Sequence, residues 1–455
     1  MRQHYGEYVT PELLEEWLLC PHKAPGRAVS SPWPDRIEIA AINQISESTF
    51  QVDGSIVEAT NSGEAARKAV TLMVVKKGDW RIKSVLLLPP KQVWGGDDSM
   101  QLSLEEKIGQ LVMVGLEGPS LNPETQLLVT DYHVGGFIFF ARNIETCQQT
   151  LTLINALKRA NAGQIPLFFS VDEEGGRVSR LPDQFPRLPV NGDIGRIGSA
   201  TLANQFGQIL AQRVKGLGFN VNYAPVLDIN SNPDNPVIGN RSYGADPDLV
   251  TRLGLEAMKG IQSQGVISVI KHFPGHGDTA VDSHVGLPQV EADLERLRTF
   301  ELLPFREAIK DGAEMVMTAH ILLPKLDPQH PATLSQRIIS GLLREELQFD
   351  GVVITDDLCM AAIKDNYDLG EAAVQAINAG VDIVSVCHDY ENYITVLNAL
   401  RDAAAKGIIP VARIDEAVTR ILKLKERYQL EDSSTPLGNV EAINEDTADL
   451  LDRLN

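Results

Sequence analysis

The sequence contains few cysteines, no excess of basic residues and no long apolar segment. Its cysteines are widely spaced and form no CxxC pair, which excludes a disulfide framework or a thiolate zinc cage and indicates reduced thiols. They are Cys20, Cys147, Cys359 and Cys387. Acidic residues outnumber basic residues by 61 to 41, for a net charge of −20. This charge argues against nucleic acid or an anionic membrane surface as a partner.

A membrane span and an export signal are also missing. No apolar run reaches the roughly 18 residues that a transmembrane helix requires. The N-terminal segment MRQHYGEYVTPELLEEW has no basic region followed by an apolar one. The sequence therefore predicts a cytoplasmic protein, or an exported one if an N-terminal signal has been lost. Its hydrophobic content of 43% is that of a folded globular protein with a sizeable core.

Residues 89–103, which are rich in Pro, Gly and Asp, separate two different patterns. Before them, in a first domain at 1–95, an amphipathic helix at 10–20 precedes several strands. The last two strands form a hairpin that turns at 77–79 and directs Trp80, Ile82 and Val85 toward a core. One helix followed by a curled antiparallel sheet resembles the cone-shaped α+β domains of the nuclear-transport-factor-like kind. This part of the sequence shows no catalytic cluster, so we expect it to have a binding or spacing role.

From residue 103 to 430 the sequence alternates short apolar runs with helical stretches, which is typical of βα units. The runs are QLVMVGL (110–116), GGFIFF (135–140), PLFFSV (166–171), FNVNYAPVLDI (219–229), ISVIK (267–271), EMVMTAH (314–320), GVVIT (351–355) and DIVSV (382–386). Eight buried parallel strands predict a (β/α)8 barrel of the TIM type. A doubly wound open sheet is the alternative, although it more often uses fewer strands. Residues 431–455 read as a polar C-terminal tail.

Polar residues follow five of these runs, at the end of the barrel where active sites lie. They are Asp172, Asp228, the pair Lys271-His272, His320 and the pair Asp356-Asp357. A further group of titratable residues occupies the loop KHFPGHGDTAVDSH at 271–284. We expect all of these side chains to meet at one rim.

Three kinds of chemistry could use such a rim. Metal binding has candidate ligands, but zinc sites usually show spacing such as HxxxH on one ordered element, and here a Pro-Gly turn lies between the first two histidines of the loop. Those candidates are His272, His276, Asp278, Asp282, His284 and His320. Carbon-acid chemistry could use Lys271 as a Schiff base if its pKa were lowered. Glycoside hydrolysis would combine a carboxylate nucleophile with a separate proton donor.

Four motifs distinguish between these alternatives by resemblance. They are KHFPGHGDTAVDSH (271–284), VDEEGGRVSRLP (171–182), NYAPVLDINSNPDNPVIGNRSYG (222–244) and VVITDDLCMAA (352–362). In this order they resemble glycoside hydrolase family 3, and more narrowly its bacterial β-N-acetylglucosaminidase branch with a histidine acid/base. The resemblance covers roughly residues 103–430, the whole predicted barrel.

The resemblance implies a role for individual residues. Asp356 matches the nucleophile, which the residues alone do not distinguish from Asp357. His284 matches the acid/base, and Asp282 orients it; a neutral imidazole can accept a proton and an imidazolium can return one. The positions that bind the sugar are matched by Asp172, Arg180, Arg241, Lys271 and His272. The implied enzyme needs no metal and no cofactor.

The activity so implied is a retaining, exo-acting β-N-acetylglucosaminidase that works through a covalent glycosyl-aspartate. Its substrate would be a muropeptide in peptidoglycan turnover, with N-acetylglucosamine linked to a muramic acid residue. A phosphorylase of N-acetylglucosaminides or glucosides and a non-catalytic sugar-binding barrel remain open. The N-terminal domain could contact cell-wall polymer or a partner protein.

Other polar residues of the rim have structural interpretations. We expect His276 and Asp278 to hold the turns of their loop, and Asp228 to be structural. His320 either lines the pocket or is a hydrogen-bonded residue of the rim. Cys359 is expected to be buried and inert.

Overall fold

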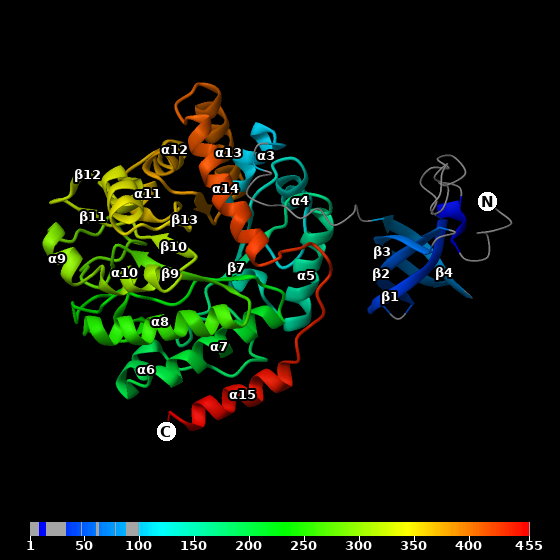
Figure 1. Cartoon of the computed structure of the whole chain (residues 1–455), viewed down its shortest axis with the longest axis horizontal. Helices are drawn as coiled ribbons and strands as arrows, with labels where there is room; N and C mark the ends of the chain where they lie inside the picture. Colours follow the sequence, from blue (N-terminus) through cyan, green and yellow to red (C-terminus); the bar gives the residue numbers. More distant parts are fainter. Residues whose placement is uncertain are drawn as a thin grey trace. The chain divides into compact units, whose positions relative to one another are not determined.

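The chain forms two compact units, residues 1–93 and 94–455 (Figure 1). The computed structural model describes residues 9–14, 33–46, 48–60, 63–77, 79–87, 99 and 101–454. The division falls within the Pro/Gly-rich segment that the sequence indicates. Within the described part of the chain, no helix has the length and apolar character to cross a bilayer.

The N-terminal unit contains an antiparallel sheet in the order β1-β2-β3-β4. The strands are β1 (Trp33–Ser46), β2 (Thr49–Thr60), β3 (Gly63–Lys77) and β4 (Asp79–Leu87). Residues 11–14 are helical, and the rest of the predicted helix at 10–20 lies outside the described residues. The β3–β4 hairpin is confirmed, with Lys77 paired to Asp79. The resemblance to nuclear-transport-factor-like domains stays a prediction.

The small core of this sheet contains Val70 and Leu72, with Ile82 packed against them. The prediction for Trp80 is wrong, because 47% of its surface is exposed. Trp80 pairs with Lys76 near the turn of the hairpin, beyond the buried residues, and its ring contacts Phe50 edge-on at 5.2 Å. The side chain of Val85 lies outside the described residues.

The second unit is built around a closed barrel whose order is β10-β13-β14-β5-β6-β7-β8-β9. Every neighbouring pair is parallel. The strands are β5 (Val112–Val114), β6 (Gly136–Phe139), β7 (Phe168–Val171), β8 (Val221–Asn222), β9 (Ile267–Phe273), β10 (Met315–Thr318), β13 (Val352–Asp357) and β14 (Ile383–Val386). Each coincides with one of the eight apolar runs, so the predicted (β/α)8 barrel is confirmed and the open sheet is excluded.

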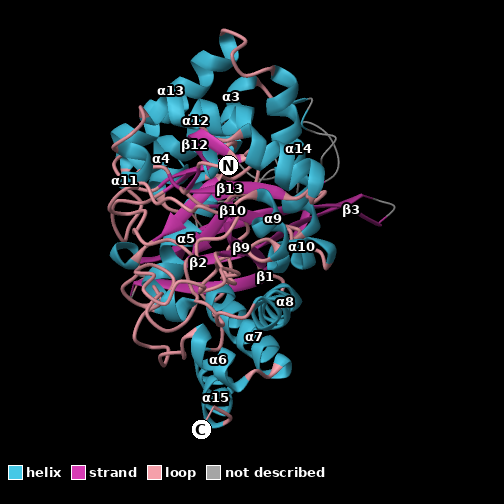
Figure 2. Ribbon diagram, turned by 90° about the vertical axis from the view of Figure 1, so that its left-hand side faces the viewer, coloured by secondary structure: helices cyan, strands magenta, loops and turns pink. Residues whose placement is uncertain are grey.

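Helices surround these strands, as Figure 2 shows. They are α3 (Leu104–Gln110), α4 (Pro123–Thr130), α5 (Cys147–Ala160), α6 (Asn191–Ile197), α7 (Ala200–Gly216), α8 (Pro247–Ser263), α9 (Leu294–Thr299), α10 (Leu303–Lys310), the π-helix η6 (Arg337–Glu346), α11 (Ala361–Lys364), α12 (Leu369–Ala379), α13 (Tyr390–Ala405), α14 (Val411–Arg427) and α15 (Val440–Asp452). The shorter elements are η3 (Ala141–Asn143), η4 (Gly239–Arg241), η5 (Ala332–Leu334), β11 (Leu322–Leu323) and β12 (Asp327–Pro331). A capping box of Ser103 and Glu106 starts α3, and Gly380 ends α12 with a φ of 115° that favours glycine.

The segment 431–455, expected as a polar tail, contains the helix α15. Leu450 on this helix is buried in a cluster with residues of α7 and α8. The hydroxyl oxygen of Thr447 accepts a hydrogen bond at 3.1 Å from Arg213, a buried residue of α7. The helix α15 at the end of the chain therefore packs along α7 (Figure 1).

Candidate active site

One cavity of about 360 Å³ lies at the carboxyl ends of the barrel strands. All eight residues that the sequence assigns to catalysis or sugar binding line it. These are Asp172, Arg180, Arg241, Lys271, His272, Asp282, His284 and Asp356. The fold thus brings together side chains from four separate motifs, as expected when the loops of a barrel meet at one end.

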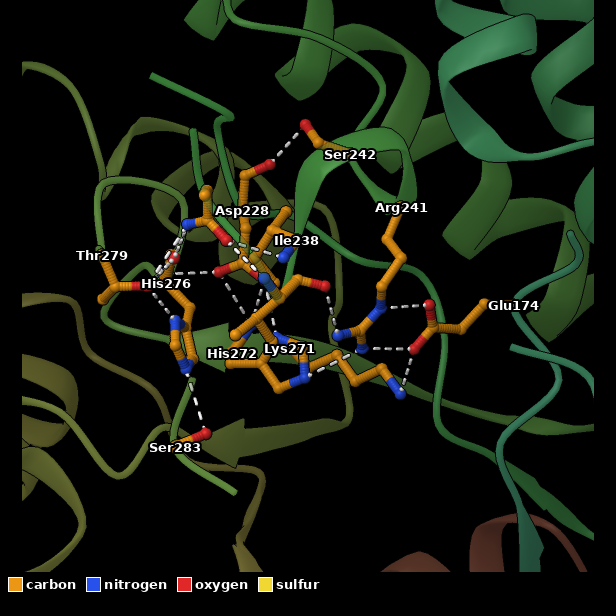
Figure 3. Close-up of polar contacts among 12 residues, drawn as sticks. Glu174, Asp228, Ile238, Arg241, Ser242, Lys271, His272, His276, Thr279 and Ser283 are labelled. Atoms are coloured by element: carbon orange, nitrogen blue, oxygen red, sulfur yellow. Dashed lines mark hydrogen bonds and ion pairs between the residues drawn. The ribbon is translucent and has the colours of Figure 1, made fainter. Parts of the chain in front are cut away.

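Lys271, at the end of β9, lies in a cluster of buried charges (Figure 3). Its Nζ is 2.7 Å from Oδ1 of Asp172 and 2.7 Å from Oε1 of Glu174. Burial alone would lower the pKa of Lys271, but the two carboxylates hold it above its usual value. The amine stays protonated, and a Schiff base, which requires a neutral amine, is disfavoured.

Glu174 is a residue of this cluster that the sequence did not single out. Its carboxylate oxygens also accept hydrogen bonds from Nε and Nη2 of Arg241, at 2.9 and 2.7 Å. Burial opposes its ionisation, yet Arg241 and Lys271 together hold the pKa of Glu174 far below its usual value. The only signal in the sequence was its place two residues after Asp172, on a segment that continues past the end of β7. Glu174 fixes the two cations that face the cavity.

Asp228 lies fully buried behind the pocket and organises the start of the β9 loop (Figure 3). Its Oδ2 is 2.6 Å from Nδ1 of His272, and its Oδ1 accepts the backbone N–H of His276 at 2.7 Å. Although burial would raise it, the neighbouring histidines hold the pKa of Asp228 below its usual value. The structural role expected for Asp228 agrees with these contacts.

His276 makes the local contact that the sequence suggests, whereas the contact of Asp278 is with a different loop, the one that follows β8. Nδ1 of His276 is 2.8 Å from the hydroxyl of Thr279, and Asp278 accepts a hydrogen bond at 3.1 Å from Ser231. Within the described part of the chain, no three or more His, Cys, Asp or Glu side chains are grouped so as to hold a metal ion.

Asp356 and Asp357 end strand β13 with different surroundings. Burial would raise the pKa of Asp356, but the charges of His320, His272 and Lys271 and the N–H of Asp357 lower it overall. Asp356 is therefore ionised at neutral pH, as a nucleophile must be. Oδ1 of Asp357 instead accepts the backbone N–H groups of Cys359 and Cys387, both at 3.0 Å.

Asp282 and His284 form a hydrogen-bonded pair on the loop after β9. Nδ1 of His284 is 2.7 Å from Oδ1 of Asp282, and the same oxygen accepts the backbone N–H of His284 at 2.8 Å. Partial burial would raise the pKa of Asp282, but these hydrogen bonds and the imidazole of His284 lower it overall. The His284 side chain is 65% exposed. With Nδ1 engaged, Nε2 is the atom that can exchange a proton with a substrate in the cavity.

His320 and Cys359 lie near the end of strand β13. His320 is buried, with Nδ1 2.8 Å from the Thr333 hydroxyl and Nε2 3.0 Å from the carbonyl of Asp357. It is the hydrogen-bonded residue of the rim, not a residue that lines the cavity. Cys359 is half-buried, not fully buried as expected, because it lies on the loop that leaves β13. Burial still raises the pKa of its thiol to about 12, which makes it unreactive.

A (β/α)8 barrel with an ionised carboxylate at a strand end and a separate His–Asp pair in the same cavity has the parts that a glycoside hydrolase needs, a nucleophile and a proton donor. Residues 103–424 match the model of the glycosyl hydrolase family 3 N terminal domain, so the chain belongs to this family. The resemblance found in the sequence is thereby confirmed.

Named relatives agree with this assignment. Beta-hexosaminidase A of Pseudoalteromonas piscicida is 38% identical over 70% of this chain, which spans 58% of that protein's length. A family 3 beta-N-acetylglucosaminidase from Paenibacillus sp. str. FPU-7 has a similar structure (TM-score 0.73, 45% identity, 77% of this chain and 68% of that one). NagZ from Neisseria gonorrhoeae, solved with N-trifluoroacetyl-D-glucosamine, matches 76% of this chain and 98% of its own, with a TM-score of 0.64 and 32% identity.

Proposed function

We propose that the protein is a retaining β-N-acetylglucosaminidase that removes single N-acetylglucosamine residues from the non-reducing ends of its substrates. The observation that carries this proposal is the convergence of Asp356, the Asp282–His284 pair and the sugar-binding residues on one cavity. The volume of about 360 Å³ lies at the lower end of the range for ligand sites, which suits a single terminal sugar.

Asp356 is the nucleophile of the proposed reaction. Its carboxylate attacks the anomeric carbon while protonated His284 gives its proton to the departing glycosidic oxygen. The resulting glycosyl-aspartate ester is then hydrolysed by a water molecule whose proton returns to His284. Asp282 stabilises the imidazolium in both the resting acid and the regenerated acid. The sugar is released with the configuration that it had in the substrate.

The charged residues of the cavity would hold the sugar. Lys271 and Arg241, fixed by Glu174, present donors to its hydroxyl groups, and Asp172 presents an acceptor. Arg180 lines the same cavity and would present further guanidinium donors to the sugar. We place the 2-acetamido group beside Asp356, which would select N-acetylglucosamine over glucose.

The proposed substrate class is N-acetylglucosaminyl-muramic acid compounds released in peptidoglycan turnover. Support comes from the relatives, which are named beta-hexosaminidase and NagZ, and from the N-acetylated sugar analogue in the NagZ structure. We further propose a cytoplasmic location and a cell-wall or protein contact for the N-terminal unit.

The test is release of nitrophenol from an aryl β-N-acetylglucosaminide by the wild type and by Asp356→Ala, in the presence of chelator. We expect turnover by the wild type, none by the variant, and β-N-acetylglucosamine as the first product seen by NMR. Formation of a sugar phosphate when phosphate is added would instead identify a phosphorylase. Absence of turnover with sugar binding retained would identify a sugar-binding barrel. A matched aryl glucoside tests the role of the acetamido group, and equal kcat/KM for the two would contradict it.

A further inference from the structure

Ser283 lies between the two residues of the proposed catalytic pair and lines the same cavity, but it is far less exposed than either. It is 2% exposed, whereas the Asp282 and His284 side chains are 32% and 65% exposed. Val285, the next residue, is 77% exposed. Ser283 is thus one of the buried residues of this loop, together with Thr279.

The hydroxyl of Ser283 is bonded to the ring of His276, with Oγ 3.3 Å from Nε2 (Figure 3). The direction of this bond follows from the other side of the ring. The Thr279 hydroxyl donates to the carbonyl of His276 at 3.0 Å, so its oxygen accepts from Nδ1 of His276. Burial lowers the pKa of His276 to about 4, which keeps the ring neutral at neutral pH. Nε2 is then an acceptor, and Ser283 donates to it.

His276 is itself held rigidly. Its backbone N–H donates to Asp228 at 2.7 Å, and the other oxygen of Asp228 is 2.6 Å from the ring of His272. A continuous path of hydrogen bonds therefore joins Ser283, on the proton-donor loop, to His272, in the proposed sugar pocket (Figure 3). Through this path, the position of the loop that carries His284 is coupled to the position of His272 in the proposed sugar pocket.

The backbone of Ser283 makes a second connection. Its carbonyl accepts the N–H of Ala362 at 3.1 Å. Ala362 belongs to α11, the short helix that follows the strand of Asp356, and first-turn N–H groups have no acceptor within their own helix. Neighbouring hydrogen bonds within the loop are local, such as those from the N–H groups of Val285 and Gly286 to the carbonyl of Asp282. Ser283 therefore connects the loop to the sugar side and to the nucleophile side of the site.

We propose that Ser283 is a positioning residue for proton transfer, which holds His284 in place through its bonds to His276 and Ala362. The inference rests on the proposed function, because it takes His284 as the acid. It predicts that loss of the Ser283 hydroxyl weakens acid catalysis without weakening the nucleophile or sugar binding.

The experiment compares Ser283→Ala with Ser231→Ala, a matched serine substitution on the loop after β8, where the Ser231 hydroxyl donates to Asp278 of the Ser283 loop. Both are assayed on an N-acetylglucosaminide with 2,4-dinitrophenol as leaving group, which departs without protonation, and on one with a poor alkyl leaving group. The measured quantity is kcat/KM, which reports the bond-breaking step. We expect Ser283→Ala to lower it about tenfold for the poor leaving group only, corresponding to the loss of one hydrogen bond. Ser231→Ala should match the wild type on both. Equal losses on both substrates would mean a structural role and overturn the proposal.

The variant His284→Ala tests separately whether His284 is the acid and whether Ser283 positions it. If His284 is the acid, this variant loses activity mainly on the poor leaving group, and adding Ser283→Ala to it causes no further loss. Additive losses would overturn the positioning role while the proposed function stands. If His284→Ala shows no dependence on the leaving group, the assignment of the acid fails, and the role of Ser283 fails with it.

Discussion

The backbone N–H of Asp357 donates a hydrogen bond to Oδ1 of Asp356 at 2.8 Å. The two successive carboxylates, although linked by this contact, have different partners. Asp357 accepts backbone N–H groups of Cys359, on the next loop, and of Cys387, just after β14, while Asp356 is ionised beside Lys271 and two histidines. Both carboxylates line the cavity, so their different hydrogen-bond partners, and not the face of the strand, distinguish them.

Asp356→Asn should abolish turnover of an aryl N-acetylglucosaminide, because an amide cannot form the glycosyl ester. Loss of a covalent nucleophile costs on the order of 10⁴-fold or more in kcat. Asp357→Asn is the matched control, since an amide oxygen can still accept the N–H groups of Cys359 and Cys387. We expect it to retain far more activity, measured as initial rates of nitrophenol release. The assignment of the nucleophile is wrong if the two variants lose activity equally.

Glu174→Gln should raise KM more than it lowers kcat. The neutral amide no longer holds Arg241 and Lys271 by charge-assisted hydrogen bonds, which are worth about 1.5–3 kcal/mol. This corresponds to an increase in KM of about 10- to 100-fold. The measurement is a full saturation curve on the aryl substrate.

Glu314→Gln provides the control for this variant. Glu314 is another buried glutamate paired with an arginine, since its carboxylate is 3.2 Å from Arg427. It precedes β10, at the end of the barrel opposite the cavity. We expect its substitution to lower the melting temperature and leave KM unchanged. An unchanged KM in Glu174→Gln as well would show that Glu174 does not organise the sugar pocket.

Glu173 should make the protein less stable as pH rises toward neutrality. Burial raises the pKa of Glu173 from an ordinary value of 4.5 to about 7, despite Arg213 at 3.9 Å. Between these pH values the folded protein holds a proton that the unfolded chain has released, so the free energy of unfolding falls with increasing pH. The full contribution is about 3 kcal/mol.

Urea denaturation from pH 5 to pH 8 tests this expectation. Relative to the wild type, Glu173→Gln should gain stability progressively across this range, because the glutamine has no proton to release. A constant difference between the two proteins would mean that Glu173 is already ionised at pH 5, paired with Arg213.

A chain that begins at Trp94 should keep the activity of the full-length protein on a soluble aryl substrate. The family match starts at residue 103, and the cavity is lined by residues of the second unit. Compact units with their own cores fold independently as a rule. The measurement is kcat/KM alongside thermal unfolding. A folded but inactive shortened chain would contradict this expectation and give the N-terminal unit a part in catalysis.

The strands of the barrel could be predicted from the sequence because they depend on a local pattern of apolar residues. The eight apolar runs became the eight strands, since a parallel strand covered on both faces must be continuously apolar. Glu174 was missed, because its importance comes from Arg241 and Lys271, which are distant in sequence. The helix α15 was missed because few of its side chains are buried, so its apolar pattern is weak. Trp80 was misplaced because alternation gives the face of a strand but not how far along that face the core extends.

By itself the sequence determined the barrel, the boundary between the units, and the residues that the family motifs mark for catalysis and sugar binding. Only the tertiary structure gave Asp356 and Asp357 their different partners, paired Glu174 with its cations, and buried Ser283 between more exposed neighbours. The periodicity of apolar residues indicates which face of its own helix or strand is buried. Partners of buried charges come from other elements, and closure of the barrel decides which of them meet.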